Sequence, residues 1–141
     1  MISIFGIASV VVALASLAVI LLHNRIMNKR APVDAYFAEL DDLLRDRIEN
    51  LYHSSSPDTK LHDLCSQYMD SSLSDMITAL TEIDRAVAAE LHTEEHETAQ
   101  TIYEAIAVLN QSIDEYNRYI AGSLPVALMA QVLGLAMVEP V

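Results

Sequence analysis

The feature that most constrains this chain is an uninterrupted apolar stretch at its beginning. Residues 2–22 carry no charged side chain, and the next basic residues are Arg25, Lys29 and Arg30. At about 1.5 Å rise per residue, a helix over this stretch is about 31 Å long, close to the roughly 30 Å hydrocarbon core of a bilayer. The sequence therefore predicts a transmembrane anchor over residues 1–22.

A cleaved signal peptide is the alternative interpretation of the same stretch. However, no basic residue precedes it, and its apolar run exceeds the roughly 7–15 residues of a signal-peptide core. The small residues of Ser16-Leu17-Ala18 lie inside the run. We therefore expect a retained anchor. Because the basic residues follow the helix, the positive-inside rule predicts an external N-terminus, with residues 23–141 in the cytoplasm.

We call Arg25, Lys29 and Arg30 the basic collar and expect it to lie at the membrane interface of the inner (cell) membrane. Within the anchor, small residues share one helical face through spacings of three and four, which lets transmembrane helices approach closely. This face predicts self-association, although small residues are also simply common in anchors. The residues of the small face are Gly6, Ser9, Ala13 and Ser16.

The rest of the chain is strongly acidic. All 20 acidic residues follow position 33, whereas three of the 8 basic residues belong to the basic collar. Such a domain repels phosphate backbones, which excludes nucleic acid as a main partner. Cys65 is the single cysteine, so no intramolecular disulfide can form and a secreted disulfide scaffold is excluded.

Apolar residues recur at helical spacing throughout this acidic part. They predict an all-α antiparallel bundle of three long helices over about 23–53, 57–91 and 95–121, with a short helix over about 125–138. We expect Ser56 to cap the second long helix and Gly122 to end the third. Ser71, Ser72 and Ser74 weaken the middle of the second helix, where a local irregularity is expected. With three antiparallel helices, the Gly122–Pro125 turn should be far from the membrane and the acidic turn 93–97 near the collar.

The tail is apolar on nearly every side and too short to span a bilayer. A helix here needs cover on more than one face. We expect one face to pack on the bundle and the other to contact a neighbouring copy or partner; the alternative is a fourth core helix in an open groove. The predicted contact residues are Leu128, Met129, Val132, Leu133, Leu135 and Met137.

No catalytic motif stands out. The chain lacks a Gly-rich phosphate loop, Gly-x-Ser-x-Gly and Cys-x-x-Cys, and no Glu is followed three residues later by His, as a di-metal carboxylate bundle requires. His92 and His96 have the spacing of a zinc pair but more simply occupy a solvated acidic turn. We predict no enzyme, no cofactor and no metal.

Both ends of the acidic part resemble the LemA family. Near the end, Leu109-Asn110 and Tyr116-Asn117 resemble its Tyr-Asn repeats, and Leu124-Pro125 and Leu133-Gly134-Leu135 resemble its closing motifs. After the anchor, residues 40–47 (Leu-Asp-Asp-Leu-Leu-Arg-Asp-Arg) resemble the family's Ile-Asp-x-x-Leu-Lys-Arg-Arg. The family's Leu-Ile-Pro-Asn is absent, so the chain would be a divergent member.

The resemblance implies a long helical bundle in the cytoplasm, a short external N-terminus and no established enzymatic activity; one relative helps to build magnetosome membranes. Together with the anchor, it leads us to expect a non-enzymatic scaffold that self-associates as a homo-oligomer or holds partners at the membrane. The alternative is a small accessory subunit of a larger membrane protein complex.

Overall fold

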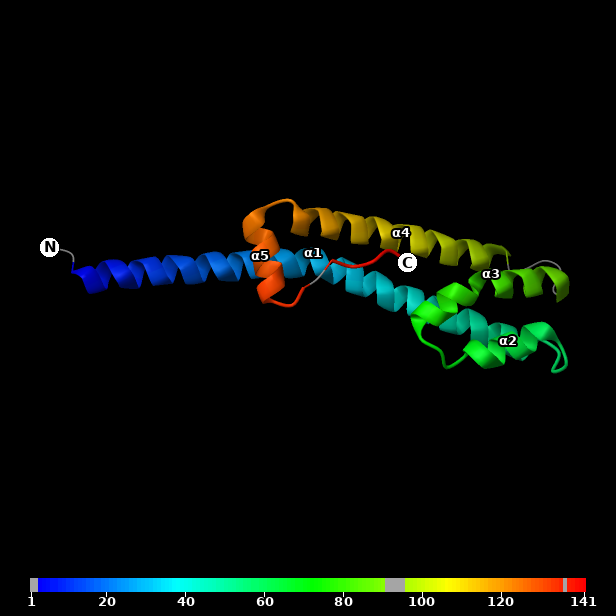
Figure 1. The fold of residues 1–141 in the computed structure, drawn as a ribbon. Helices are drawn as coiled ribbons and strands as arrows, with labels where there is room; N and C mark the ends of the chain where they lie inside the picture. The colour runs from blue at the N-terminus through cyan, green and yellow to red at the C-terminus, as the bar shows by residue number, and fades with distance from the viewer. Residues whose placement is uncertain (1–2, 91–95, 136) are drawn as a thin grey trace. The chain divides into compact units, whose positions relative to one another are not determined.

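The structure is a computed structural model that describes residues 3–90, 96–135 and 137–141. Helices α1 (Ile4–Ser54), α2 (Lys60–Tyr68), α3 (Leu73–Glu90), α4 (His96–Ala121) and α5 (Leu124–Val132) account for most of these residues (Figure 1). The all-α prediction is confirmed. The chain divides into two compact units, Met1–Asp34 with Ser112–Pro140 and Ala35–Gln111 with Val141.

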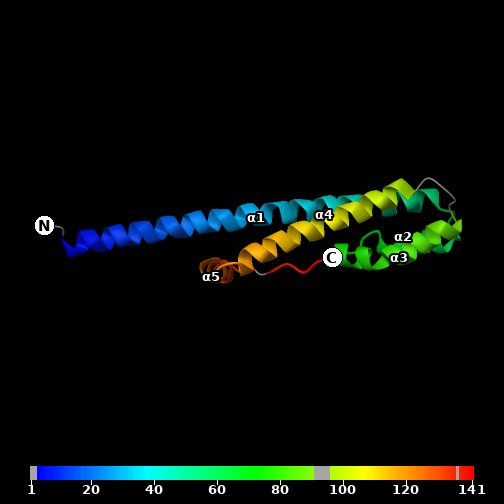
Figure 2. The same ribbon diagram turned by 90° about the horizontal axis from the view of Figure 1, so that it is seen from above.

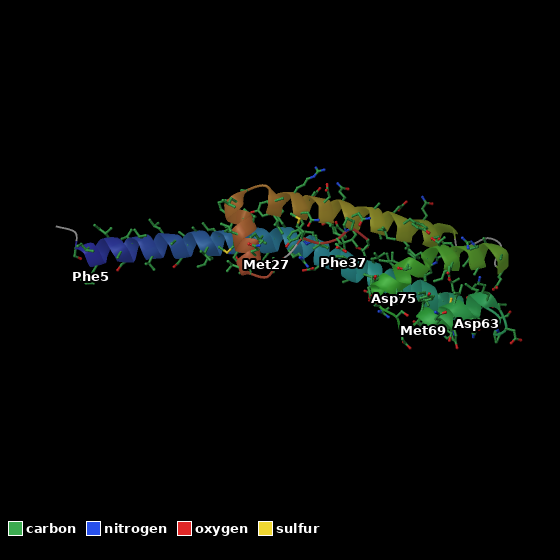
Figure 3. The ribbon with its side chains drawn as sticks, viewed as in Figure 1. Phe5, Met27, Phe37, Asp63, Met69 and Asp75 are labelled. Atoms are coloured by element: carbon green, nitrogen blue, oxygen red, sulfur yellow. The ribbon has the colours of Figure 1, made fainter. Side chains whose placement is uncertain are left out.

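Helix α1 is continuous through Pro32. Over its first part, within the first unit, the helix is long and apolar enough to cross a membrane, and none of that span is buried by the rest of the described chain. Side chains such as Phe5, which is 85% exposed, project outward with no other segment beside them (Figure 3). The first fully buried side chain along α1 is Ile26.

The second unit is an up-down-up-down arrangement of four helical segments. Its part of α1 is followed by α2, α3 and the first part of α4, each running opposite to the one before (Figures 1 and 2). The predicted apolar stripes form its core, because every one of the following side chains is buried: Leu40, Leu44, Ile48, Leu51, Leu61, Cys65, Met76, Leu80, Ile83, Ile102 and Leu109.

The predicted second helix over 57–91 is wrong as one element, because the chain breaks between Tyr68 and Leu73 and reverses. Ser72 accepts a hydrogen bond on its hydroxyl from the Asp75 amide (3.3 Å) and thereby begins α3. The Arg45 guanidinium donates to the carbonyls of Met69 (3.4 Å) and Ser71 (3.0 Å), which satisfies acceptors that the broken helix leaves open.

The cap of α2 also differs from the prediction. Thr59, not Ser56, is the N-cap, with extended backbone (φ −95°, ψ 155°) and a hydroxyl that accepts from the His62 amide at 3.3 Å. Ser56 precedes Pro57, whereas Thr59 follows it. Helix α2 therefore begins three residues later than expected, at Lys60.

In the first unit, the end of α4 lies beside the part of α1 that carries the basic collar. The Arg30 guanidinium contacts Tyr116, and the Lys29 ammonium lies over the Tyr119 ring. The prediction that the Gly122–Pro125 turn is far from the membrane end is therefore wrong. The extra reversal between α2 and α3 changes the direction in which α4 runs, so its C-terminal end returns towards the anchor.

Helix α5 is shorter than the predicted 125–138. Ser123 caps its start, accepting from the Val126 amide at 3.4 Å. Gly134 ends it with φ +69°, a left-handed conformation that favours glycine, and the Leu135 amide donates back to the Ala130 carbonyl at 2.8 Å. The described residues after Gly134, 135 and 137–141, are not helical, so the predicted helix stops because Gly134 permits this C-terminal turn.

Candidate membrane-proximal site

The basic collar is the polar feature of α1 that lies next to the apolar span. Arg30 donates from Nη1 to the Tyr116 hydroxyl at 3.3 Å and from Nε to Asp34 at 3.1 Å, and its guanidinium carbon lies 5.1 Å from the centre of the Tyr116 ring. Burial alone would lower the pKa of Arg30, but the hydrogen bonds to Tyr116 and Asp34 outweigh it and raise the pKa. The fully buried Tyr116 ring thus joins α4 to a permanent positive charge.

Lys29 and Arg25 complete the collar and are exposed. The Lys29 Nζ lies 5.9 Å from the centre of the Tyr119 ring, which places a second cation over an aromatic of α4. Arg25 borders a hollow of about 290 Å³ that is otherwise lined by Ala18, Leu21 and Leu22. An arginine head above leucine side chains suits the boundary between lipid headgroups and acyl chains.

Helix α5 belongs to the same unit and has two distinct faces. Val126 and Ala130 are buried, so one face packs on the protein as the sequence predicts. The opposite face leaves Leu124, Leu128 and Val132 exposed at 72%, 53% and 82%. Of the other predicted contact residues, Leu133 and Met137 are exposed, while Met129 and Leu135 are half-buried.

Two asparagines of α4 hold the non-helical tail by hydrogen bonds that the sequence did not predict. In the first unit, the Asn117 amide donates to the Val138 carbonyl (2.7 Å) and accepts from the Val138 amide (2.9 Å). In the second unit, Asn110 makes the same pair of bonds with Val141, at 3.0 and 2.8 Å. Both asparagines come from the Tyr-Asn-like repeats, whose other members, Leu109 and Tyr116, are buried.

The second unit contains a charged cluster that links three helices. Arg47 of α1 is 2% exposed and donates from Nη2 to Asp84 of α3 at 2.6 Å. Tyr103 of α4 donates its hydroxyl to the same carboxylate, and this hydrogen bond raises the pKa of Tyr103. Arg47 belongs to the LemA-like run 40–47, and the sequence analysis did not predict its burial.

Over the residues that the structure describes, no group of three or more His, Cys, Asp or Glu side chains is placed to hold a metal ion. The pair His92 and His96 falls outside the described side chains, as does most of the acidic turn 93–97. Glu90, at the end of α3, accepts from the Leu61 amide at 3.3 Å. Cys65 is fully buried in the apolar stripe, as expected for a core residue.

The small face of the anchor is accessible along its length. Ser9 and Ser16 donate their hydroxyls to the carbonyls of Phe5 and Val12, both at 2.8 Å, and Ala13 is exposed between them. Each hydroxyl is thereby satisfied inside the helix, which an apolar environment requires.

Comparison with known proteins identifies no relative, because no family model, curated protein or solved structure matches the chain.

Proposed function

We propose that the protein is a membrane-anchored, non-enzymatic scaffold that holds partners, or copies of itself, at the cytoplasmic face of the inner membrane. The observation that carries this proposal is the continuity of α1. Its bare apolar part suits a bilayer, and its later part supplies Leu40, Leu44 and Ile48 to the core of the acidic unit. The same helix therefore belongs to both units, so the anchor and the acidic domain are joined without an intervening non-helical segment.

The orientation in this proposal depends on the basic collar. Its three cations closely follow the apolar span, which favours a cytoplasmic domain under the positive-inside rule. Within the collar, the hydrogen bonds to Tyr116 and Asp34 raise the pKa of Arg30. We further propose that the chain is a divergent relative of the LemA family, supported by the structural roles of Asn110 and Asn117.

The scaffold hypothesis includes self-association, which the anchor helix can support. The small face of Gly6, Ser9, Ala13 and Ser16 lets a second helix approach closely, and no described side chain covers it. The alternative, an accessory subunit of a larger membrane complex, is favoured by the exposed row on α5. In that case the anchor and α5 would fill gaps between the helices of other proteins.

Native mass of the full chain, extracted in mild detergent, separates these functions. Scaffolding by self-association predicts a symmetric homo-oligomer that Ala13→Leu reduces to monomer, because the larger side chain keeps the helices apart. The matched control is Ala15→Leu, on the other side of the same helix, which should leave the mass unchanged. A fixed stoichiometry with other proteins would favour the accessory subunit, and a monomer without partners would contradict both.

A further inference from the structure

Helix α5 exposes more apolar surface than a helix of a water-soluble domain normally does. The chain has no charged residue between Arg118 and Glu139. Leu124, Leu128 and Val132 follow one another at four-residue spacing and form an exposed row, opposite the buried Val126 and Ala130. Contiguous apolar rows of this kind mark contact surfaces for membranes or proteins.

The direction of α5 decides which contact the geometry favours. Within the first unit, α5 runs across the axis of α1 in Figure 1 and is seen nearly end-on in Figure 2, so it does not run along α1. The end of α4 that leads into α5 lies beside Lys29, in the basic collar that follows the apolar span. If α1 crosses the bilayer along its axis, α5 therefore lies in the plane of the membrane, near its cytoplasmic surface.

The groups next to this position match the chemistry of a lipid. Arg25 borders the hollow lined by Ala18, Leu21 and Leu22, so a headgroup phosphate and an acyl chain both have suitable neighbours there. Lys29 adds a second exposed cation one helical turn further along α1. A neighbouring copy would have to supply apolar cover at this level, whereas lipid surrounds every inserted anchor.

We propose that α5 is an interfacial helix whose row of Leu124, Leu128 and Val132 inserts among the acyl chains of the cytoplasmic leaflet, with Arg25 and Lys29 at the level of the headgroups. This inference rests on the proposed function, because it requires α1 to cross the membrane. It adds a second membrane contact to the first unit, beside the anchor itself.

Depth-dependent fluorescence quenching of the full chain tests the inference. The Cys65→Ser chain receives one new cysteine, Leu128→Cys, labelled with an environment-sensitive fluorophore. It is reconstituted in phosphatidylcholine–phosphatidylglycerol vesicles with or without lipids brominated on the acyl chains. We expect brominated lipid to quench the emission, because the apolar face of an interfacial helix lies about 5–10 Å into the boundary between headgroups and acyl chains. The labelled Asp114→Cys, on the exposed face of α4, is the control that should not be quenched.

A probe at Leu14→Cys, inside the anchor, separates failure of the inference from failure of the proposed function. Quenching at position 14 without quenching at 128 would overturn the interfacial helix and leave the anchor intact. No quenching at either position would contradict membrane anchoring and the inference with it. Disulfide crosslinking between copies at position 128, without quenching, would assign the row to a second copy and overturn the inference.

A second variant tests whether quenching depends on the apolar row and not on the probe itself. Leu128→Asp places a charge in the middle of the row and should abolish quenching of a probe at Val132→Cys, because the carboxylate draws the helix out of the acyl region. The matched control is Gln111→Asp, on an exposed position of α4, which should leave that quenching unchanged. Equal quenching in the two variants would contradict insertion of α5.

Discussion

Replacing Asp84 by Asn should destabilise the protein more than any other single change of an exposed or half-exposed carboxylate. The substitution keeps the shape and the hydrogen-bond acceptor but removes the negative charge 2.6 Å from Arg47, which is 2% exposed. Removing one partner of a buried ion pair costs roughly 3–5 kcal/mol, because the remaining charge stays desolvated. The Asp84 side chain is 28% exposed, so we expect the lower end, about 3 kcal/mol.

Urea unfolding of the full chain in detergent micelles, followed by circular dichroism, measures this loss. With a slope of about 1.5 kcal/mol per molar urea, a loss of about 3 kcal/mol lowers the midpoint by about 2 M. The matched control is Asp114→Asn, which breaks a pair of similar length with Arg118 (3.0 Å) whose side chains are 58% and 79% exposed. That pair should contribute about 0–1 kcal/mol. Equal shifts for the two variants would refute the reasoning that burial of Arg47 sets the cost.

The remaining predictions concern the tail, a tyrosine and the cysteine. Asn117→Ala removes both side-chain hydrogen bonds to Val138, so amide hydrogen exchange at Val138 should accelerate; unchanged exchange would contradict a clamped tail. Because the hydrogen bond to Asp84 raises the pKa of Tyr103, its contribution to stability is present below about pH 10 and is lost as the pH rises through the raised pKa. Urea midpoints should therefore fall less steeply at alkaline pH in Tyr103→Phe than in the parent chain, and identical slopes would exclude this contribution. Cys65 should react with a maleimide only after unfolding, and rapid labelling of the folded chain would show that its burial is wrong.

The regular parts of the fold could be predicted from the sequence because they depend on local periodicity. Helix α4 begins and ends within one residue of the expected bounds, and the apolar positions of α1 form the core as their spacing indicates. Such local patterns can be recognised without knowing which distant residues pack against each other. Leu128 and Val132 of the exposed row were among the predicted contact residues, whereas Leu124 was not, and what covers the row stays a prediction.

The reversal between α2 and α3 could not be predicted in the same way. The helical period continues across Ser71 and Ser72, whereas the carbonyls at the break accept hydrogen bonds from Arg45, which lies 24 and 26 residues earlier in the chain. Missing this one reversal also inverted the expected direction of α4 and placed the Gly122–Pro125 turn at the wrong end. The Arg47–Asp84 pair escaped notice because its partners are 37 residues apart.

Labelling of one cysteine tests whether α1 is a retained anchor with the acidic domain in the cytoplasm. In the Cys65→Ser chain, Ser54→Cys places an accessible thiol at the end of α1. A membrane-impermeant maleimide is applied to intact cells and to cells whose membrane has been permeabilised. A retained anchor with the acidic domain in the cytoplasm predicts labelling only after permeabilisation. Labelling of intact cells would contradict it, because either an inverted anchor or a cleaved signal peptide puts residue 54 outside.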